Sequence, residues 1–216
     1  MGKTGKIANY EDIRQLPPKV RQMYIAVIQM LEEGADPANI RVSTITEKAG
    51  IGKGTAYEYF DSKEEIVAGA IVYQVQCVFD WLGSALEEKA GFREQIQFLL
   101  DEIEKKDGQK NCFFRFFHMM ADNSEFSLLV REKMMTEAFL PGLPTSVFAK
   151  MLQRGVERGE LRREIPMDYM IHCVFSHLLI YMLAITSGGL FRIDTDSIRS
   201  MAYQGILNEL EDRNNI

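Results

Sequence analysis

One short stretch of the sequence gathers side chains that can hold a phosphate group or touch the edge of a base. The stretch carries two lysines with a glycine, a threonine and two tyrosines between them: Lys53, Gly54, Thr55, Tyr57, Tyr59 and Lys63. Ammonium and hydroxyl groups are common partners of nucleic-acid phosphates, and a threonine can meet a base edge or a thymine methyl. The glycine lets the backbone come close to such a ligand. The stretch predicts a nucleic-acid surface, with packing inside a small domain as the alternative for each tyrosine.

Two short helices joined by a turn must position these side chains. Ile45 and Ala49 stand four residues apart on one helix face, and Gly50 follows where that helix has to stop, because glycine can adopt the positive φ of such a stop. In the next helix, Ala56 and Phe60 share the inward face at the same spacing, which leaves the polar residues for other surfaces. This pattern predicts a helix-turn-helix followed by a polar turn and a longer helix.

The same residues resemble the helix-turn-helix of the tetracycline-repressor (TetR) family. The matching segments are, in order, Ile45-Thr46, Ala49-Gly50-Ile51, Lys53-Gly54-Thr55, Tyr57-Glu58-Tyr59-Phe60 and Ser62-Lys63-Glu64-Glu65. An ordered run of about a dozen positions is much harder to meet by chance than a bare helix-turn-helix pattern. The match covers the N-terminal third in sequence detail, and beyond it the length and helical architecture agree. The resemblance implies an all-α fold with a TetR-like arrangement.

The resemblance also implies which residues contact DNA. In the family the residues that match Lys53, Gly54, Tyr57, Tyr59 and Lys63 commonly do so. The chain has Gly52 where the family frequently has a serine, and Thr46 where alanine is usual. It also has Arg41 or Val42 where a capping hydroxyl is often found. We expect Ser43, or Thr44 with Glu47 as a capping box, to cap the first helix instead, and Arg41 to take over a phosphate contact. The complete predicted set is Arg41, Ser43, Thr44, Lys53, Gly54, Thr55, Tyr57, Tyr59 and Lys63.

Composition is that of a soluble globular protein. Hydrophobic residues make up 46% of the 216 residues and charged residues 26%. The three cysteines are far apart and lack a Cys-x-x-Cys pair, which argues against a disulfide framework or a zinc site and fits a reducing cytoplasm. No apolar run opens the chain, so no secretory signal is indicated. The most apolar run, 169–185, includes two histidines and a serine, and a buried helix suits it better than a membrane span.

The net charge of −6 is distributed unevenly along the chain. Residues 1–24 carry five basic and two acidic residues, a net +3, and the remaining residues carry −9. Attraction to phosphate acts over about one Debye length, roughly 8 to 10 Å, so a local basic edge matters more than the total. The acidic remainder keeps non-specific DNA binding low.

The periodic pattern predicts two domains connected by a long helix. Residues 1–62 form an N-terminal arm and the helix-turn-helix domain, and residues 63–216 form an effector-binding and dimerisation domain. Proline and glycine positions place the helices at 18–33, 63–89, 92–105, 112–121, 125–139, 147–158, 167–186 and 196–210. The step from Gly155 to Leu161, Gly-x-x-x-Gly-Glu-Leu, resembles one that often precedes the dimer helices of the family.

Two further expectations concern the C-terminal domain. In the family it binds a small molecule, and the candidate lining is a set of aromatic and methionine side chains that suits an apolar effector. The set is Phe113, Phe116, Phe117, Met120, Met134, Met135, Phe175 and Tyr181, with plain core packing as the alternative for each. The helices near 167–186 and 196–210 resemble the pair that forms the family's homodimer interface as a four-helix bundle. A monomeric core is the alternative.

The resemblance implies a dimeric repressor that binds a palindromic operator and is released by a ligand. Two other function classes are alternatives. For an enzyme, His118 and Asp122 are four residues apart and make half a metal site, but no third ligand accompanies them. Neither a glycine-rich phosphate loop nor paired catalytic carboxylates are found, so we expect no catalysis, metal or cofactor. A coactivator without DNA binding is the second alternative. Glu58 and the overall acidity favour it, and the lysines and Tyr57 argue against it.

Overall fold

The computed structural model describes residues 16–105, 124–135, 144–186 and 194–212. Throughout these ranges the regular elements are helices, apart from one isolated antiparallel bridge between Leu161 and Glu211. This confirms the all-α prediction. The chain divides into two compact units: an N-terminal unit, Met1–Val78 with Arg115–Leu143, and a C-terminal unit, Phe79–Phe114 with Pro144–Ile216.

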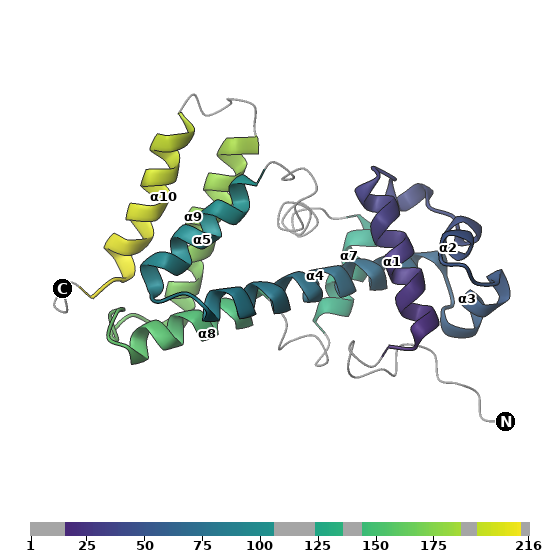
Figure 1. Cartoon of the computed structure of the whole chain (residues 1–216), viewed down its shortest axis with the longest axis horizontal. Coiled ribbons are helices and arrows are strands. Elements are labelled where there is room, and N and C mark those ends of the chain that lie inside the picture. Colours follow the sequence, from purple (N-terminus) through teal and green to yellow (C-terminus); the bar gives the residue numbers. More distant parts are fainter. Residues whose placement is uncertain (1–15, 106–123, 136–143, 187–193, 213–216) are drawn as a thin grey trace. The chain divides into compact units, whose positions relative to one another are not determined.

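The N-terminal unit contains the helix-turn-helix. Its described elements are α1 (Pro18–Glu32), the 3-10 turn η3 (Pro37–Asn39), α2 (Val42–Lys48), α3 (Lys53–Tyr59), the first part of α4 (Lys63–Glu87) and α7 (Glu125–Met134). Helix α1 packs against α2, and α2 packs against α3 (Figure 1). Gly34 and Gly50 follow α1 and α2 with φ of 94° and 67°, as the sequence predicted. Both helices therefore end where only glycine is unstrained.

An apolar core holds this unit together. Helix α1 contributes Val20 and Val27, and α2 contributes Ile45, each with no exposed surface. The buried ring of Tyr24 packs against Phe60 and Tyr73, with ring centroids 5.9 and 5.8 Å away. Burial, together with the nearby charge of Glu65, raises the pKa of the Tyr24 hydroxyl well above its usual range. The helix-turn-helix is thereby packed against the beginning of α4.

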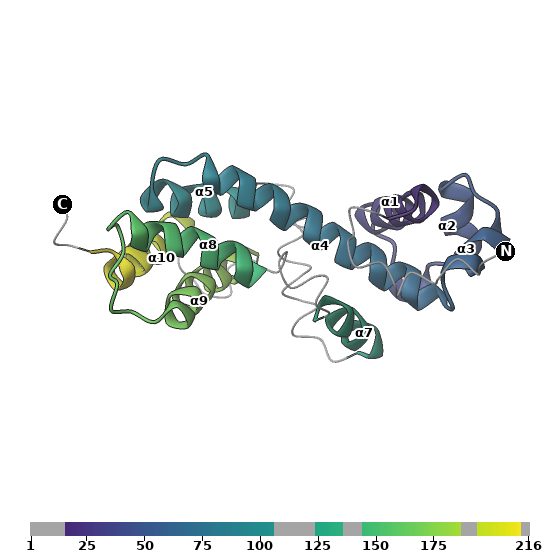
Figure 2. The same ribbon diagram turned by 90° about the horizontal axis from the view of Figure 1, so that it is seen from below.

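The C-terminal unit is a packed set of longer helices. It contains the end of α4, α5 (Phe92–Glu104), α8 (Pro144–Glu157), α9 (Met167–Thr186) and α10 (Thr195–Leu210). Helices α9 and α10 lie side by side, α5 packs against both (Figure 1), and α8 packs against α9 and α5 (Figure 2). Helix α8 begins three residues earlier than predicted, because a proline is tolerated in the first turn of a helix. Helix α9 has the predicted bounds.

A polar cluster ties α5 to α9 and α10. The guanidinium of Arg199 bonds Asp101 at 2.6 Å and Glu104 at 2.6 Å, and the buried Tyr181 donates its hydroxyl to Glu104. Burial opposes the ionised form of Glu104, but the hydrogen bonds from Tyr181 and Arg199 outweigh it and hold the Glu104 pKa below its usual value. Burial and the bond to Glu104 raise the pKa of Tyr181. The cluster joins residues that are 77 to 98 positions apart in the sequence.

Helices α4 and α9 are also long and apolar enough to meet a length and composition test for a membrane span. Core helices of soluble proteins pass the same test, so the result is weak support for a membrane location. In α4, half of the tested window is buried within the protein, whereas in α9 only 33% is. The apolar surface of α9 is therefore only partly covered within one chain.

Candidate nucleic-acid interface

The two helices of the helix-turn-helix are short and firmly anchored. Each has seven residues, and their inward faces contribute Ile45, Ala56 and Phe60 to the core with at most 3% exposure. Thr46, at a position where the family has alanine, is also buried, and its hydroxyl donates to the carbonyls of Val42 at 3.0 Å and Ser43 at 3.1 Å. The polar atom is thus satisfied inside its own helix. The opposite faces of α2 and α3 remain available.

Most of the predicted DNA contacts lie on that available surface. We call the exposed members the helix-turn-helix surface: Arg41, Ser43, Thr44, Lys53, Gly54 and Tyr57. Tyr57 is 51% exposed, and a Cβ added at residue 54 would meet no atom within 4 Å. Thr55 is half-buried, and Tyr59 is half-buried against the core of the unit. Packing inside the domain, the alternative given for each tyrosine, therefore applies to part of the Tyr59 side chain.

The predicted capping of α2 is wrong. Helix α2 begins at Val42 with Arg41 in the cap position, and no side chain accepts a hydrogen bond there. Val42 is only 8% exposed, so packing draws the chain into the helix before Ser43. Thr44 consequently lies inside the first turn and cannot form a capping box with Glu47. Helix α3 likewise begins after Gly52 without a side-chain cap.

The cationic side chains near this surface differ in their partners. The structure gives Arg41 and Lys53 no ion pair or side-chain hydrogen bond among the residues it describes. Lys48, in contrast, pairs with Glu33 at 2.6 Å. Lys63 donates to the backbone carbonyl of Ala38 at 2.7 Å. Within the described ranges, Arg41 and Lys53 therefore keep all their donors for an anion, Lys48 has a carboxylate partner, and Lys63 has a neutral carbonyl partner.

The predicted effector residues are divided between the units. Phe113, Phe116, Phe117 and Met120 lie outside the described residues, as do His118 and Asp122. Met134 is buried and Met135 is 68% exposed at the end of α7, in the N-terminal unit. Phe175 and Tyr181 belong to α9 in the C-terminal unit. Phe175 packs edge-on against Phe148 with centroids 4.7 Å apart. The pocket therefore stays a prediction.

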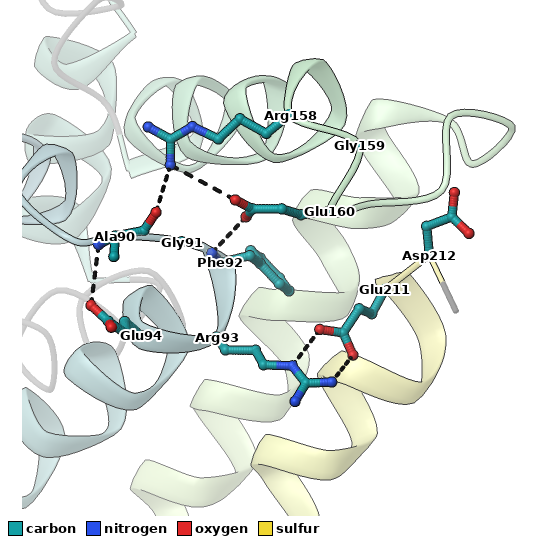
Figure 3. A pocket seen from close by; sticks show the side chains of 10 residues that line it. All are labelled: Ala90, Gly91, Phe92, Arg93, Glu94, Arg158, Gly159, Glu160, Glu211 and Asp212. Atoms are coloured by element: carbon teal, nitrogen blue, oxygen red, sulfur yellow. Dashed lines mark hydrogen bonds and ion pairs between the residues drawn. The ribbon is translucent and has the colours of Figure 1, made fainter. Parts of the chain in front are cut away.

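An open cavity of about 510 Å³ lies in the C-terminal unit, where the α4–α5 connection meets the ends of α8 and α10 (Figure 3). Its lining is Ala90, Gly91, Phe92, Arg93, Glu94, Arg158, Gly159, Glu160, Glu211 and Asp212. The guanidinium of Arg93 bonds both carboxylate oxygens of Glu211, at 2.6 and 2.8 Å. These charges are directed at each other, and the partners are 118 residues apart in sequence. None of the lining residues belongs to the sites predicted from the sequence.

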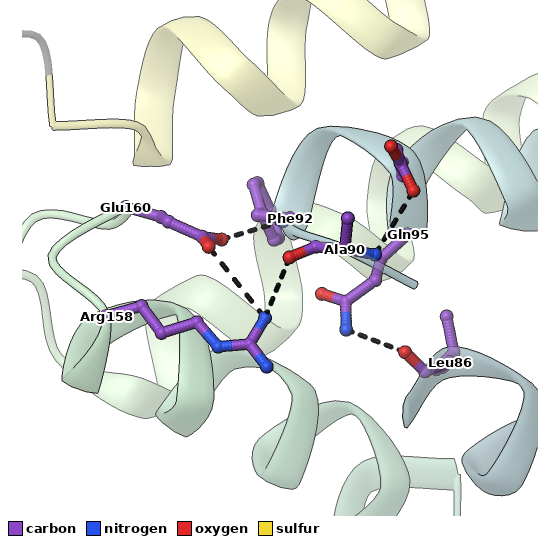
Figure 4. Close-up of polar contacts among 7 residues, drawn as sticks. Leu86, Ala90, Phe92, Gln95, Arg158 and Glu160 are labelled. Carbon is purple, nitrogen blue, oxygen red and sulfur yellow. Dashed lines mark hydrogen bonds and ion pairs between the residues drawn. The ribbon is translucent and has the colours of Figure 1, made fainter. Parts of the chain in front are cut away.

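Four side chains fix the backbone of the α4–α5 connection. Two come from α5 itself: Gln95, which is 4% exposed, donates to the carbonyl of Leu86 at 2.9 Å, and Glu94 accepts from the amide of Ala90 at 3.1 Å (Figure 4). Hydrogen bonds of this kind satisfy backbone groups that helix ends leave without partners.

The other two side chains come from the α8–α9 turn. Arg158 donates to the carbonyl of Ala90 at 3.1 Å, and Glu160 accepts from the amide of Phe92 at 2.7 Å. This gives the Gly-x-x-x-Gly-Glu-Leu step a physical reason. A Cβ at residue 155 would come within 2.7 Å of the buried Leu161 side chain, and Gly159 has φ of 73°. The step places a carboxylate at the first turn of α5. Hydrogen bonds and an ion pair therefore hold together the three segments that line the cavity: the α4–α5 connection, the α8–α9 turn and the end of α10.

Comparison with known proteins agrees with the helix-turn-helix assignment. A family model described as bacterial regulatory proteins, tetR family, matches residues 30–70. The fatty acid metabolism regulator protein of Bacillus subtilis (strain 168) is 26% identical over 90 residues, 42% of this chain and 46% of that protein. The chain thus spans about half the length of this curated relative.

Solved structures share the fold over most of the chain. The fatty acid degradation regulator FadR from Bacillus halodurans is 18% identical with a TM-score of 0.59, covering 90% of this chain and 97% of that chain. FadR from Bacillus subtilis is 17% identical with a TM-score of 0.59, covering 86% and 98%. The curated relative, like these structures, is named a regulator. The helix-turn-helix motif, its geometry and the family model agree over residues 30–70, and this segment is similar to bacterial regulatory proteins of the tetR family.

Proposed function

We propose that this regulator binds a palindromic operator as a homodimer and is released from it by an apolar effector. The observation that carries DNA binding is the helix-turn-helix surface, where exposed Arg41 and Lys53 hold no acceptor among the described residues and the backbone at Gly54 is open. Charge left unpaired on a surface attracts a counter-charge from another molecule. In this division of labour, residues 1–62 bind DNA and residues 63–216 bind the effector and the second subunit, in the cytoplasm.

The geometry suits one mode of DNA binding. Helix α3 enters the major groove with its N-terminal residues toward the bases, while the residues around it contact the backbone. Lys53 and Tyr57 reach phosphate oxygens, and Thr55 meets a base edge or thymine methyl. Gly54 allows the backbone to approach because no side chain stands above it. A two-fold dimer then reads two half-sites about one helical turn apart, which is why the operator is an inverted repeat.

Salt dependence tests this binding mode. Operator duplexes are selected from a random pool, and their affinity for wild type and Lys53→Ala is measured over a range of salt concentrations. Loss of one phosphate contact reduces the slope of log affinity against log salt by about 0.9. Lys150→Ala is the control, because Lys150 is exposed on α8 in the other unit. Failure of wild type to select any duplex would favour the alternative of an interaction protein.

An exposed stripe on α9, in which three of five side chains are aliphatic or aromatic, supports the homodimer. Tyr169, Ile180 and Leu183 are 53%, 50% and 39% exposed. Exposed His172 and Ser176 lie between them, so the steps along α9 are three or four residues and the five share one helix face. Met201 on the neighbouring α10 is 61% exposed. An apolar stripe that one chain leaves in water is typical of a surface that a second subunit covers.

A charge in this stripe tests the dimer. Ile180→Asp places a carboxylate in the proposed interface, and we expect it to convert a two-chain species into a single chain in sedimentation. Leu128→Asp is the control, because Leu128 is similarly exposed, at 51%, on α7. A single-chain wild type, or equal loss of the dimer in both variants, contradicts the assignment of this face.

The comparisons suggest which effectors to test first. FadR from Bacillus subtilis, which shares the fold, has a structure in complex with stearoyl-CoA. The predicted lining of aromatic and methionine side chains is compatible with a long apolar chain. We therefore propose long-chain acyl compounds as the effector class. Stearoyl-CoA should release the selected operator duplex in a gel shift, whereas free coenzyme A should not, and equal effects of the two would exclude recognition of the acyl chain.

A further inference from the structure

Arg162, in the turn between α8 and α9, holds a buried donor without an acceptor. Its Nε atom is buried, and neither a hydrogen bond from this atom nor an ion pair of the guanidinium is found among the described residues. The side chain as a whole is half-buried, whereas that of the next residue, Arg163, is exposed. The large majority of buried polar side-chain atoms in native proteins have a partner. The acceptor for Arg162 is therefore to be sought outside the single described chain.

The backbone places Arg162 at one end of the α9–α10 pair. Its amide donates to the carbonyl of Leu210, the last residue of α10, at 3.0 Å. The preceding residue, Leu161, forms the bridge with Glu211, and successive side chains of such an extended segment point to opposite sides. Leu161 is fully buried. Arg162 is therefore directed away from the core of its own unit.

Arg162 lies beside the exposed stripe of α9. Tyr169, the first residue of that stripe, donates its hydroxyl to Glu209 at 2.7 Å. The bond to Glu209 raises the pKa of the Tyr169 hydroxyl, and the positive charge of Arg162 opposes that rise, so the guanidinium lies near this hydroxyl. No ion pair joins Arg162 to Glu209 within the described ranges. Arg162 is thus continuous with the surface assigned above to the second subunit.

The stripe belongs to a strongly acidic pair of helices. Helix α9 and residues 194–212 together contain six carboxylates and one arginine, a net charge of −5. Within the chain, Arg93 neutralises Glu211, and the arginine of the pair, Arg199, is already held by carboxylates of α5. A two-fold interface brings two such faces together, and their like charges repel. An unpaired cation at the edge of each face reduces this repulsion.

We propose that the guanidinium of Arg162 binds a carboxylate of the second subunit, so that each chain supplies the acceptor that the other lacks. The inference rests on the proposed homodimer. In a two-fold interface the contact occurs twice, once for each copy of Arg162. Nε and a terminal nitrogen of arginine form a planar fork that fits both oxygens of a carboxylate, and such charged hydrogen bonds are stronger than neutral ones.

Sedimentation of two neighbouring variants tests this contact. Arg162→Met removes every donor and keeps an unbranched apolar stem. Arg163→Met is the matched control, because Arg163 is exposed in the same turn. Loss of a hydrogen-bonded charge costs about tenfold in affinity, so the loss of two contacts should raise the dissociation constant of the dimer by roughly a hundredfold. Arg163→Met should change it by less than about threefold, as for an exposed charge.

Urea unfolding separates the contact from a defect in the fold. Within one chain the Nε atom has no acceptor to lose, so Arg162→Met should leave the urea midpoint of the single-chain Ile180→Asp protein unchanged. In the dimeric wild type the same substitution should lower the midpoint, because association stabilises the folded chain. A lower midpoint in both backgrounds would show that Arg162 supports its own chain, which overturns the inference.

The remaining outcomes separate this contact from the homodimer itself. If wild type is a dimer that Ile180→Asp dissociates, but Arg162→Met dimerises as tightly as wild type, the contact is overturned and the proposed homodimer stands. A wild type that sediments as a single chain overturns both. If sulfate raises the urea midpoint of Ile180→Asp and the added Arg162→Met substitution abolishes that rise, a free anion takes the position assigned to the second subunit, and the inference is wrong.

Discussion

The two units of the molecule use their positive charges in different ways. On the helix-turn-helix surface of the N-terminal unit, Arg41 and Lys53 have no acceptor within the part of the chain that the structure describes. In the C-terminal unit three arginines from α5, α8 and α10 bridge to carboxylates on other segments, as the pairs Arg93–Glu211, Arg154–Glu87 and Arg199–Asp101. Partners that are distant in sequence hold helices to each other, whereas unpartnered charge is available to another molecule. The charge pairing therefore distinguishes a surface for binding from a unit built to keep its arrangement.

The two units also differ in the contacts that hold their interiors together. The N-terminal unit encloses a continuous apolar core, in which the buried Tyr24 ring and hydroxyl lie close to Gly69. The C-terminal unit adds a histidine packed on the backbone of Gly205 and the fixed α4–α5 connection. Substitutions at Gly69, Gly205 and Glu160 should therefore distinguish how much apolar packing and polar contacts each contribute to the free energy of unfolding.

The largest effect is expected from Gly69→Ala in the N-terminal unit. A Cβ there would overlap the Tyr24 hydroxyl and lie 2.7 Å from its ring carbon Cζ, and Tyr24 is too buried, at 3% exposure, to move aside. Overpacking of this kind costs about 3 kcal/mol of unfolding free energy, measured by urea denaturation. Gly54→Ala is the control, since its Cβ meets nothing and alanine favours a helix by up to about 1 kcal/mol. Equal stability of both variants would show that the Tyr24 ring can relocate.

Gly205→Ala tests the corresponding contact in the C-terminal unit. The new Cβ would overlap His177 Nε2 and lie 2.7 Å from its Cδ2. His177 is only half-buried and has more room than Tyr24, although its Nδ1 donates to the carbonyl of Cys173 at 2.9 Å. We expect a loss of about 2 kcal/mol in urea denaturation. The double variant Gly205→Ala with His177→Ala should recover part of it, and a purely additive result would place the strain elsewhere.

Elements whose ends are marked by local chemistry could be predicted from the sequence. Gly34 and Gly50 end α1 and α2 because their backbones require positive φ, and that requirement is visible in the residue type itself. The start of α2 could not be predicted in the same way. Ser43 and Thr44 look like caps, but burial of Val42 draws the helix start forward, and burial depends on the whole unit.

The candidate interface, too, could be predicted from the sequence only in part. The exposed residues of α3 follow from helical spacing once Ala56 and Phe60 are assigned to the core. The partner of Lys63 is a carbonyl 25 residues away and that of Glu160 is an amide 68 residues away, and no local pattern specifies either partner, because both are backbone groups. Residue type identified these side chains as important. Only the fold shows what each one bonds.

A smaller effect is expected at the α4–α5 connection. Glu160→Ala removes the acceptor of the Phe92 amide and should cost about 1 kcal/mol, the usual value for losing a helix cap. Glu160→Gln keeps an oxygen acceptor and should retain most of the stability. Hydrogen exchange at the Phe92 amide checks the assignment directly, since it should speed up in the alanine variant and stay slow in the glutamine variant. Slow exchange in both would mean that another group satisfies this amide.

The smallest expected effect is the acid sensitivity contributed by Glu104. Its pKa is lower in the folded protein than the usual 4.5, so its contribution to stability is fully present above that pH and is lost as the pH falls through the lower folded value. Tyr181→Phe removes one of the hydrogen bonds that lower this pKa. The variant should therefore lose less stability than wild type between pH 6 and pH 3 in urea denaturation. Tyr169→Phe is the control: its hydroxyl bonds Glu209 on α10, so the variant should leave the Glu104 contribution intact. Identical pH profiles for wild type and Tyr181→Phe would assign the acid response of this cluster to Arg199 alone. The ion pairs of the C-terminal unit, and not the tyrosine hydroxyl, would then be the polar contacts that stabilise it.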